Sequence, residues 1–325
     1  MTQQIPGEPI ARQGVPRFHR ILVTGATGLL GSPLVSALTA QGYVVAGMGK
    51  RVREVPPGGA SEYLYGGLAE PEASVLLRPW RWDAVIHLAG PVPRTHHELP
   101  EQYPLLAEHV STALTVCAAI PGGWRGRFIH ISGMNVYGIP QYLPVDEAHP
   151  LRPMNVYGAA KALAEQVVCA WAARERWDLW VLRICGLFTE SRRSGAIYQF
   201  LAAALQQRLL TISAPVPLPW DVIHVDDAVE AIVRSLESAQ ECPGPVNIGY
   251  GSPVDLSSMA RQIIQLTDSR STIEEKAGVR HPPFQMDIRK AQRLLNWPPT
   301  TLEARLDRMR SAIEAQLTQR EASCV

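Results

Sequence analysis

The sequence predicts an α/β fold in which a doubly wound parallel sheet is joined to a smaller C-terminal lobe. A glycine-rich turn lies between an apolar strand and an amphipathic helix near residue 25. Strands then alternate with helices up to about residue 188, and beyond that point the alternation weakens. Strands that alternate with helices form parallel βαβ units, and such units build a doubly wound sheet.

Each predicted element has its own segment of sequence. The segment "RILVTGATGLLGSPLVSALTAQGY", from Arg20, contains a strand, the turn and a helix. Further strands are expected in "VVAGMGKR", "DAVIHLAG", "RFIHIS" and "DLWVLRICGLF", with helices over residues 105–120 and from Tyr157 to about Glu175. Beyond these we expect a helix that begins at Asp226 and Asp227, a last sheet strand in "PVNIGYG", and helices in "LSSMARQIIQ" and "DIRKAQRLLNWPP". Acidic side chains suit the positive end of a helix dipole, so the two aspartates are expected to cap that helix.

The composition excludes several classes of partner. Of the 325 residues, 46% are hydrophobic and 19% are charged, which allows a sizeable core. The formal net charge is +1 and there is no long basic run, so neither nucleic acid nor a membrane is expected as a partner. The five cysteines form no CxxC pair, and no apolar run is long enough for a signal peptide or a membrane span. We expect a cytoplasmic protein without a metal site that acts on a small molecule.

The turn "TGATGLLG" places Gly25, Gly28 and Gly31 at G-x-x-G-x-x-G spacing between a strand and a helix. Glycine lets the backbone approach a pyrophosphate closely, and the helix N-terminus supplies free N–H groups and partial positive charge. The pattern therefore predicts a Rossmann-type dinucleotide site. The neighbouring residues Thr27, Leu29 and Leu30 are predicted to contact the cofactor as well.

The end of the second strand indicates which dinucleotide is bound. An NAD site usually has Asp or Glu there, which binds the ribose hydroxyls. Here Gly49 occupies the acidic position, and Lys50 and Arg51 follow it. Two cations attract a 2′-phosphate, whereas a carboxylate repels one. The sequence therefore predicts NADP, as NADPH, rather than NAD, unless the two residues are ordinary solvated loop charges.

The chain is expected to have three parts. Residues 1–17, punctuated by Pro and Gly, are predicted to be a flexible tail. Residues 18–186 are predicted to form the NADP-binding Rossmann domain. Residues 187–325 are mainly a substrate-binding lobe, with a strand near 245–249 that returns to the sheet.

The segment "NVYGAAKALAEQ" presents Tyr157 and Lys161 four residues apart on one face of a predicted helix. An ammonium beside a phenol favours the phenolate and lowers the pKa of the tyrosine from its usual value of about 10. Tyr157 is therefore predicted to exchange a proton with a substrate oxygen while hydride moves to or from the cofactor. Lys161 is predicted to tune the tyrosine and to bind the nicotinamide ribose.

Taken in order, several motifs identify a family resemblance. From about Arg20 to about Leu306 the chain resembles the extended short-chain dehydrogenases/reductases, the NAD(P)-dependent epimerase/dehydratase family. The resemblance rests on "TGATGLLG", "VIHLAG", "RFIHISGMNVYG", "YGAAK", "VLRICGLF", "VIHVDDAVEAI", "VNIGYGSPVDL" and "DIRKAQRLLNWPPTT". It implies that Leu88, Ala89 and Cys185 contact the cofactor. It also implies a homodimer formed through a four-helix contact between the helices over 105–120 and 157–175.

The chain departs from the family at Gly133. Family members usually carry a second hydroxyl residue there, which binds the substrate oxygen, but this chain reads "SGMNVYG". Either Ser132 or a water takes that role, or the active site is weakened. Met134 and Asn135 follow where dehydratases carry Asp and Glu, and because neither can act as a general acid or base, dehydration is disfavoured.

A second departure concerns the substrate. Nucleotide-sugar enzymes of this family carry Asn at the strand exit where this chain has Gly186 in "LRICGLF". This lowers the case for a nucleoside-diphosphate sugar without removing it, and Arg280 is a candidate phosphate contact or a plain surface residue. His87 and His130 are expected in the core, and His96 and His97 near the mouth of the site.

Three functions follow as hypotheses. The first is an NADPH-dependent ketoreductase that acts on a ketone, with a nucleotide-linked keto-sugar or a natural-product intermediate as candidate substrates. The second is an NAD(P)-dependent nucleotide-sugar epimerase. The third is an NADP-binding sensor or scaffold with weakened catalysis, for which Gly133 is the supporting feature and Tyr157 with Lys161 the opposing one. The identity of the substrate does not follow from the sequence, because specificity is expected to reside in the C-terminal lobe and in loops such as "PVPRTHHELP" and "TESRRSGAIYQF".

Overall fold

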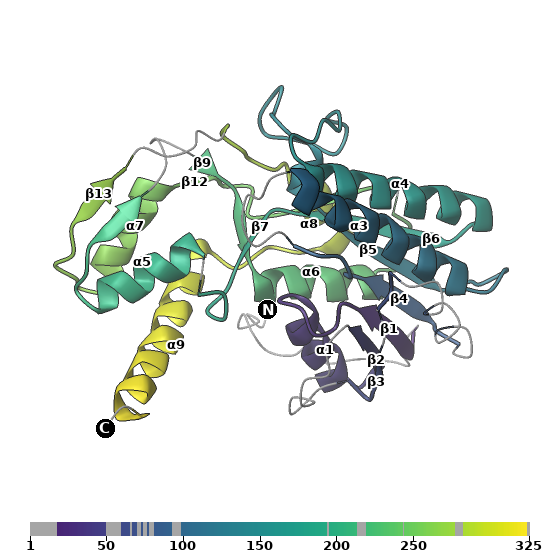
Figure 1. The fold of residues 1–325 in the computed structure, drawn as a ribbon, viewed down its shortest axis with the longest axis horizontal. Helices are drawn as coiled ribbons and strands as arrows, with labels where there is room; N and C mark the ends of the chain where they lie inside the picture. Colours follow the sequence, from purple (N-terminus) through teal and green to yellow (C-terminus); the bar gives the residue numbers. More distant parts are fainter. Residues whose placement is uncertain are drawn as a thin grey trace, which may run out of the picture.

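The computed structural model describes residues 18–49, 60–65, 67–69, 73, 77, 81–92, 99–193, 195–212, 219–242, 244–276 and 282–323. Within these residues the chain forms a large lobe around one sheet and a smaller lobe that contains the C-terminal helix (Figure 1). The predictions made for residues 1–17, for Lys50 and Arg51, for His96 and His97 and for Arg280 lie outside the described residues.

The large lobe is built on a seven-stranded sheet in the order β3-β2-β1-β4-β5-β6-β11, and every pairing in it is parallel. The strands are β1 (Arg20–Thr24), β2 (Val44–Gly49), β3 (Glu62–Tyr65), β4 (Ala84–His87), β5 (Arg127–Gly133), β6 (Asp178–Ile184) and β11 (Val246–Ile248). The predicted doubly wound fold is thereby confirmed. The strand order reverses between β1 and β4, and in such sheets ligands bind beyond the carboxyl ends of the strands at this point.

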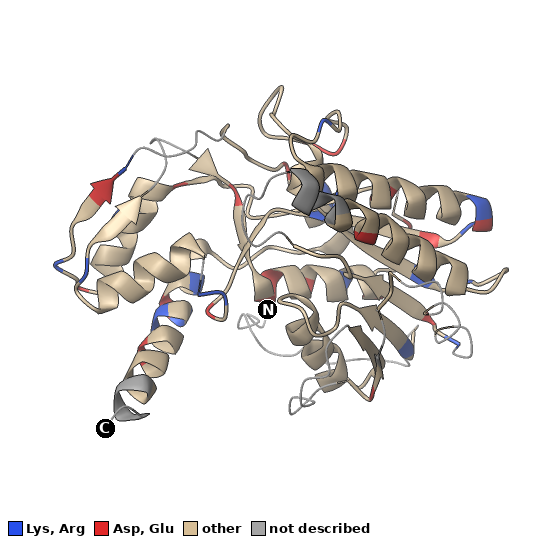
Figure 2. Ribbon diagram, in the orientation of Figure 1, with Lys and Arg blue, Asp and Glu red and all other residues tan. Residues whose placement is uncertain are grey.

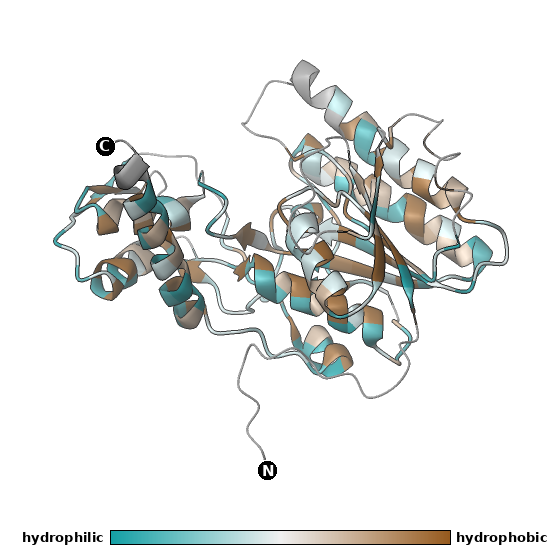
Figure 3. Cartoon of the chain, turned by 90° about the horizontal axis from the view of Figure 1, so that it is seen from below, coloured by the Kyte–Doolittle hydropathy of each residue, from teal (hydrophilic) through white to brown (hydrophobic). Residues whose placement is uncertain are grey.

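Helices cover both faces of the sheet. One face packs on α1 (Gly31–Ala40), α6 (Val225–Glu237) and α8 (Arg289–Leu295), and the other packs on α3 (Leu99–Ala119) and α4 (Val156–Glu175). Successive residues of a strand point into the apolar cores on opposite faces of the sheet. Val85 packs in the core on the α3/α4 side, and Ile86 packs in the core on the α1/α6 side. In Figure 3 the apolar strands lie between these helices. The helix expected over 105–120 begins earlier, at Leu99.

The smaller lobe contains short strands and three helices. Its helices are α5 (Ala196–Leu205), α7 (Leu256–Leu266) and α9 (Leu302–Ser323), which share a third apolar core. Its strands, together with those that lead into it, are β7 (Gly186–Phe188), β8 (Leu210–Ile212), β9 (Pro219–Trp220), β10 (Val222–His224), β12 (Val254–Asp255) and β13 (Ile273–Glu275). A short 3₁₀ turn, η1 (Met134–Val136), follows β5. The segment 189–200, expected to be a loop, ends in α5 because "AIYQFLAAAL" places one apolar face on the third core.

Charged residues are distributed over both lobes (Figure 2). Within the part of the chain that the structure describes, no helix combines the length and the apolar character needed to cross a membrane. The same residues contain no group of three His, Cys, Asp or Glu side chains arranged to bind a metal ion.

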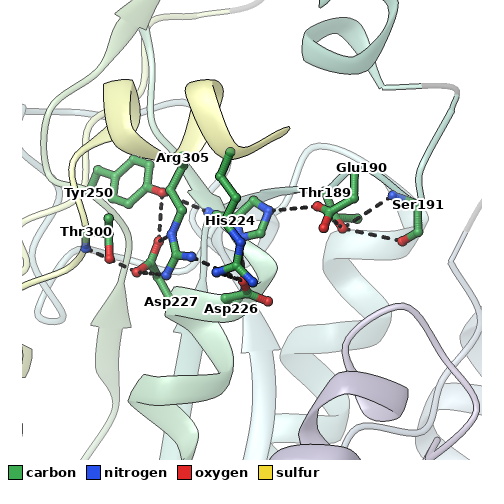
Figure 4. Close-up of polar contacts among 10 residues, drawn as sticks. Thr189, Glu190, Ser191, His224, Asp226, Asp227, Tyr250, Thr300 and Arg305 are labelled. Atoms are coloured by element: carbon green, nitrogen blue, oxygen red, sulfur yellow. Dashed lines mark hydrogen bonds and ion pairs between the residues drawn. The ribbon is translucent and has the colours of Figure 1, made fainter. Parts of the chain in front are cut away.

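A polar network joins the start of α6 to α9 (Figure 4). Asp227 is fully buried and accepts hydrogen bonds from the Arg305 guanidinium at 2.7 and 2.8 Å, from the Tyr250 hydroxyl at 2.9 Å and from the Thr300 backbone N–H at 3.1 Å. Burial by itself raises the pKa of Asp227, but the hydrogen bonds and charge of Arg305 outweigh it and lower that pKa below its ordinary value. The network therefore fixes the small lobe against the sheet.

The expected acidic caps of α6 need a correction. The N-cap residue is His224, whose Nδ1 accepts a hydrogen bond from the Asp226 backbone N–H at 3.2 Å. Asp226 and Asp227 belong to the first turn of the helix. Asp227 is thus a structural residue that pairs with α9, and its position near the helix N-terminus adds a favourable interaction with the helix dipole.

Replacing Asp227 with Asn should lower the free energy of unfolding at pH 7 by about 3 kcal/mol, because the buried charge of Arg305 would keep only the partly exposed Asp226 as its counter-ion. The lowered pKa of Asp227 adds a pH dependence. Its stabilisation is complete above the unfolded-state value of about 3.9 and is lost as the pH falls through the folded value below it. Urea unfolding at pH 7, and between pH 5 and 3, measures both effects.

Asp307→Asn is the matched control, because that carboxylate is exposed and pairs with Arg310 on the surface of α9. It should change the stability little. Equal stability of Asp227→Asn and the wild type at pH 7 would contradict the role given to the network.

Candidate functional site

The glycine-rich turn after β1 is tightly packed on itself. Gly25 has a φ of +71°, and the Gly28 N–H donates to its carbonyl oxygen at 2.9 Å. A Cβ at Gly31 would lie 2.0 Å from the same oxygen, and one at Gly25 would lie 3.0 Å from the Ala89 nitrogen. The turn therefore needs glycine at these two positions, and it leads directly into the N-terminus of α1.

Leu88 and Ala89 lie beside this turn. The Leu88 N–H donates to the Thr24 carbonyl at 3.2 Å, and the Ala89 N–H donates to Oγ1 of Thr24 at 3.3 Å. They follow β4 at the point where the strand order reverses. The structure therefore brings them together with Gly25 at the carboxyl edge of the sheet.

A cavity of about 590 Å³, here called the cofactor cleft, opens above the turn. Its lining includes Thr27, Gly28 and Leu29 on one side and Thr189, Glu190 and Asp226 on the other. Two other predicted cofactor contacts have buried side chains. The Leu30 side chain packs in the core on the α1 side of the sheet, and Cys185 is buried, with its N–H donating to the Ile248 carbonyl at 3.0 Å.

Tyr157 and Lys161 lie at the start of α4. The helix is capped by Asn155, whose side-chain oxygen accepts a hydrogen bond from the Gly158 N–H at 2.8 Å. The Lys161 ammonium is buried and donates a hydrogen bond to the Ile131 carbonyl of β5 at 3.0 Å. This bond fixes the first turns of α4, and with them Tyr157, against the carboxyl end of β5.

The pKa of Tyr157 differs from the expectation. Burial raises the pKa of the Tyr157 phenol to about 12, and the cation that partly opposes this shift is Arg192. Burial also lowers the pKa of Lys161 to about 8, partly offset by Glu165. The expected lowering of this pKa by Lys161 is therefore not seen, because desolvation disfavours the phenolate more than nearby positive charge favours it.

His109 of α3 lies edge-on to Tyr157, with ring centroids 5.6 Å apart. Its Nε2 lies 2.8 Å from the Pro91 carbonyl oxygen, so Nε2 carries the proton that is donated to this oxygen. Burial and the charge of Lys161 lower the pKa of His109 to about 3, which keeps the ring neutral. His109 was not predicted as a site residue from the sequence. His87 and His130 are core residues as expected, stacked 5.4 Å apart.

Gly133 is extended, with a φ of −156°, so the backbone does not require a glycine there. A Cβ at this position would meet one atom within 4 Å, the Ile184 carbonyl oxygen at 3.5 Å. Ser132 is 3% exposed, and its hydroxyl has no hydrogen-bond partner among the described residues. Ser132 lies on the sheet face covered by α3 and α4, because Phe128, four residues earlier in the same strand, packs on that face. Ser132 and Tyr157 therefore lie on the same side of β5.

A second cavity of about 620 Å³, here called the substrate cavity, lies between the end of β5 and the small lobe. Asn135, Asn155 and Arg192 supply its polar side chains, while Trp220, Phe284 and Met259 are among its apolar ones. Sequence reasoning missed Arg192 and Trp220 as individual residues. The signal available for Arg192 was its place in "TESRRSGAIYQF", a segment expected near the substrate.

This fold and this site define an enzyme of the extended short-chain dehydrogenase/reductase type. A model described as "NAD dependent epimerase/dehydratase family" matches residues 21–249, and the chain belongs to that family.

Similar proteins act on nucleotide sugars according to their names. The chain is 27% identical over 319 residues to UDP-glucose 4-epimerase from Azospirillum brasilense, covering 90% of this chain and 86% of that one. It is 26% identical over 315 residues to UDP-glucuronic acid decarboxylase 1 from Danio rerio, covering 92% and 72%. Among solved structures, MoeE5 in complex with UDP-glucose and NAD has a TM-score of 0.77 at 26% identity, covering 92% of this chain and 99% of that one. UDP-glucuronic acid 4-epimerase from Bacillus cereus, with UDP-glucuronic acid and NAD, shares the fold at a TM-score of 0.79 and 24% identity, covering 91% and 99%.

Replacing Gly31 with Ala should weaken dinucleotide binding at least about tenfold, because the added methyl group would overlap the Gly25 carbonyl and distort the turn. Quenching of nicotinamide fluorescence on titration with NADPH and with NADH measures the change. Gly122→Ala is the control, since a Cβ there meets nothing within 4 Å. Unchanged affinity in Gly31→Ala would show that the turn does not hold the cofactor.

Proposed function

We propose that the chain is an NAD(P)-dependent epimerase, which oxidises and then re-reduces one alcohol carbon of its substrate. The observation that carries the proposal is the placement of Tyr157 and Lys161 on one face of α4, fixed to the end of β5 by the bond from Lys161 to Ile131. The cofactor cleft fits a dinucleotide, because the glycines of the turn carry no side chains and so let a pyrophosphate approach the backbone closely. When bound there, the nicotinamide would supply and accept hydride.

Tyr157 is the residue that exchanges a proton with the substrate oxygen. With a pKa of about 12, the phenol is protonated at neutral pH and can donate to a ketone oxygen. To accept a proton from an alcohol it needs additional positive charge nearby, which favours the phenolate. Among the described residues, Arg192 lowers the pKa of Tyr157, and Lys161 is a second cation one helical turn away on α4, with its own pKa lowered by burial to about 8.

Two features support epimerisation over the net ketone reduction that the sequence first favoured. A ketone intermediate must present both faces to the cofactor, and the substrate cavity, at about 620 Å³, leaves room for it to turn. In addition, two UDP-glucose 4-epimerases are among the relatives. Ketoreduction is the second candidate. The feature that favours it is the NADP(H) pattern at the end of β2, because NADPH is suited to net reduction.

We also propose that NADP(H) is the preferred cofactor. A Cβ at Gly49, where an NAD site would have its carboxylate, would lie 2.9 Å from Oγ1 of Thr27, so an acidic side chain does not fit there without movement of Thr27. Lys50 and Arg51 follow in the sequence. The similar structures named above contain NAD, so a preference for NADP(H) would distinguish this chain from them.

A homodimer through α3 and α4 is a further proposal. Leu114 on α3 and Leu163 on α4 are each 42% exposed, on two helices that pack against each other. Large apolar side chains on a paired helical surface favour association with a second copy. Light scattering that gave the mass of a monomer at micromolar concentration would contradict this proposal.

Replacing Tyr157 with Phe should reduce turnover by about 10²–10⁴-fold while the affinity for the dinucleotide stays within twofold, because only the proton carrier is removed. For an epimerase, turnover is measured as inversion of configuration at the substrate stereocentre. For a reductase, it is measured as the loss of NADPH absorbance. An epimerase also keeps its cofactor through gel filtration. Tyr142→Phe, at an exposed tyrosine, is the control. Turnover that survived in Tyr157→Phe would remove the proposed mechanism.

Replacing Lys50 and Arg51 together with Ala should weaken binding of NADP⁺ by about tenfold or more and leave binding of NAD⁺ unchanged, because only the 2′-phosphate loses its cations. Calorimetric titration of the same variant with both dinucleotides provides the comparison. If both affinities fell equally, or if the wild type preferred NAD⁺, the cofactor assignment would be wrong.

A further inference from the structure

The substrate cavity is apolar over most of its wall. Among the described lining residues, Arg192 is the one cation and Asn135 and Asn155 are the two amides. The oxygen of Asn155 is already used to cap α4, where it accepts from the Gly158 N–H at 2.8 Å. Aromatic and thioether side chains form much of the remaining surface, including Phe188, Trp220, Met259 and Phe284.

An indole fills the space where the family places an amide. The resemblance implies Asn at position 186 in nucleotide-sugar enzymes, and this chain has glycine. A Cβ at Gly186 would lie 3.1 Å from Nε1 of Trp220 and 3.6 Å from its Cδ1. An Asn side chain at this position would therefore meet the indole. The tryptophan has replaced the amide as the group that a bound molecule meets at this point of the cavity.

Trp220 is positioned by the backbone around it. The Phe284 N–H donates to the Pro219 carbonyl at 2.9 Å, and Trp220 and Phe284 form a parallel β-bridge. Their ring centroids lie 6.0 Å apart with planes inclined at 46°. The two rings thus form a preformed aromatic corner. Such a surface favours the burial of apolar or aromatic ligand groups.

The charges of the cavity lining also favour a substrate other than a nucleoside diphosphate. A diphosphate carries at least two negative charges, and each buried charge requires a counter-ion or several N–H donors. Among the described residues, the lining offers one guanidinium, which matches one carboxylate or phosphate in a bidentate arrangement. Arg192 lines the cavity together with Asn155, the N-cap of α4 two residues before Tyr157, so the cation is at the end of the cavity near the tyrosine.

We propose that the substrate is a hydroxy or keto compound that carries one anionic group, bound by Arg192 near the reacting carbon, and an apolar group that packs on Trp220 and Phe284. Among the residues that the structure describes, the lining does not supply the counter-ions that a nucleoside diphosphate would need. The inference rests on the proposed function for the position of the reacting carbon beside Tyr157, and it departs from the named substrates of the relatives. Specificity in this chain is then a matter of apolar complementarity and one ion pair.

Calorimetry on the full chain with NADP⁺ bound tests the inference, with 4-phenylbutanoate and UDP as probes. The expected result is binding of 4-phenylbutanoate at least about tenfold tighter than binding of UDP. Trp220→Ala should weaken 4-phenylbutanoate by about tenfold, and Trp171→Ala, at a half-buried position near the C-terminal end of α4 that does not line the cavity, should leave it unchanged. Arg192→Gln should weaken 4-phenylbutanoate but not the neutral probe 4-phenylbutanol.

The inference is overturned if UDP binds as tightly as 4-phenylbutanoate, if 4-phenylbutanoate does not bind, or if Trp220→Ala leaves its affinity unchanged. Binding is measured without turnover, so the outcomes separate this inference from the proposed function. Turnover of a UDP sugar would support the proposed function and refute the apolar substrate. Tight binding of 4-phenylbutanoate, with no turnover on a panel of aryl hydroxy and keto acids, would support the apolar cavity and count against the proposed function.

Discussion

The hydrogen bond from the Lys161 ammonium to the Ile131 carbonyl is the interaction on which the candidate site depends. It joins α4 to β5 at the end of the sheet where both cavities open, and it does so with a buried cation. Burial makes the lysine easier to deprotonate and the neighbouring tyrosine harder to ionise. Tyr157 is therefore protonated and able to donate a proton, and the reverse direction depends on additional positive charge beside it.

The parts of the site that rest on local pattern could be predicted from the sequence. The glycine turn and the pair of Tyr157 and Lys161 depend on spacing within one segment, so they were predictable before the fold was known. The pKa of Tyr157 was not, because it depends on burial by residues from other elements. The aromatic corner of Trp220 and Phe284 was equally inaccessible, since it forms between two segments far apart in the sequence.

The same reasoning applies to the fold. The doubly wound parallel sheet followed from alternating apolar strands and helices, but β3 and α9 were missed. The short strand "EYLY" lies between glycine-rich segments, and α9 is so rich in charge that its apolar stripe, with Leu306, Met309 and Ile313, is narrow. Both elements are stabilised by tertiary packing, which a single sequence does not reveal.

The junction between α6 and α9 affects how the molecule can open. Asp226 lines the cofactor cleft and at the same time pairs with Arg305 and Arg308 of α9, while Asp227 beside it is buried with Arg305. Swinging the lobes apart at this point would break the hydrogen bonds that Asp227 accepts from Arg305, Tyr250 and Thr300. We therefore expect the two lobes to move little relative to each other here, so that ligand entry does not require the junction between α6 and α9 to open.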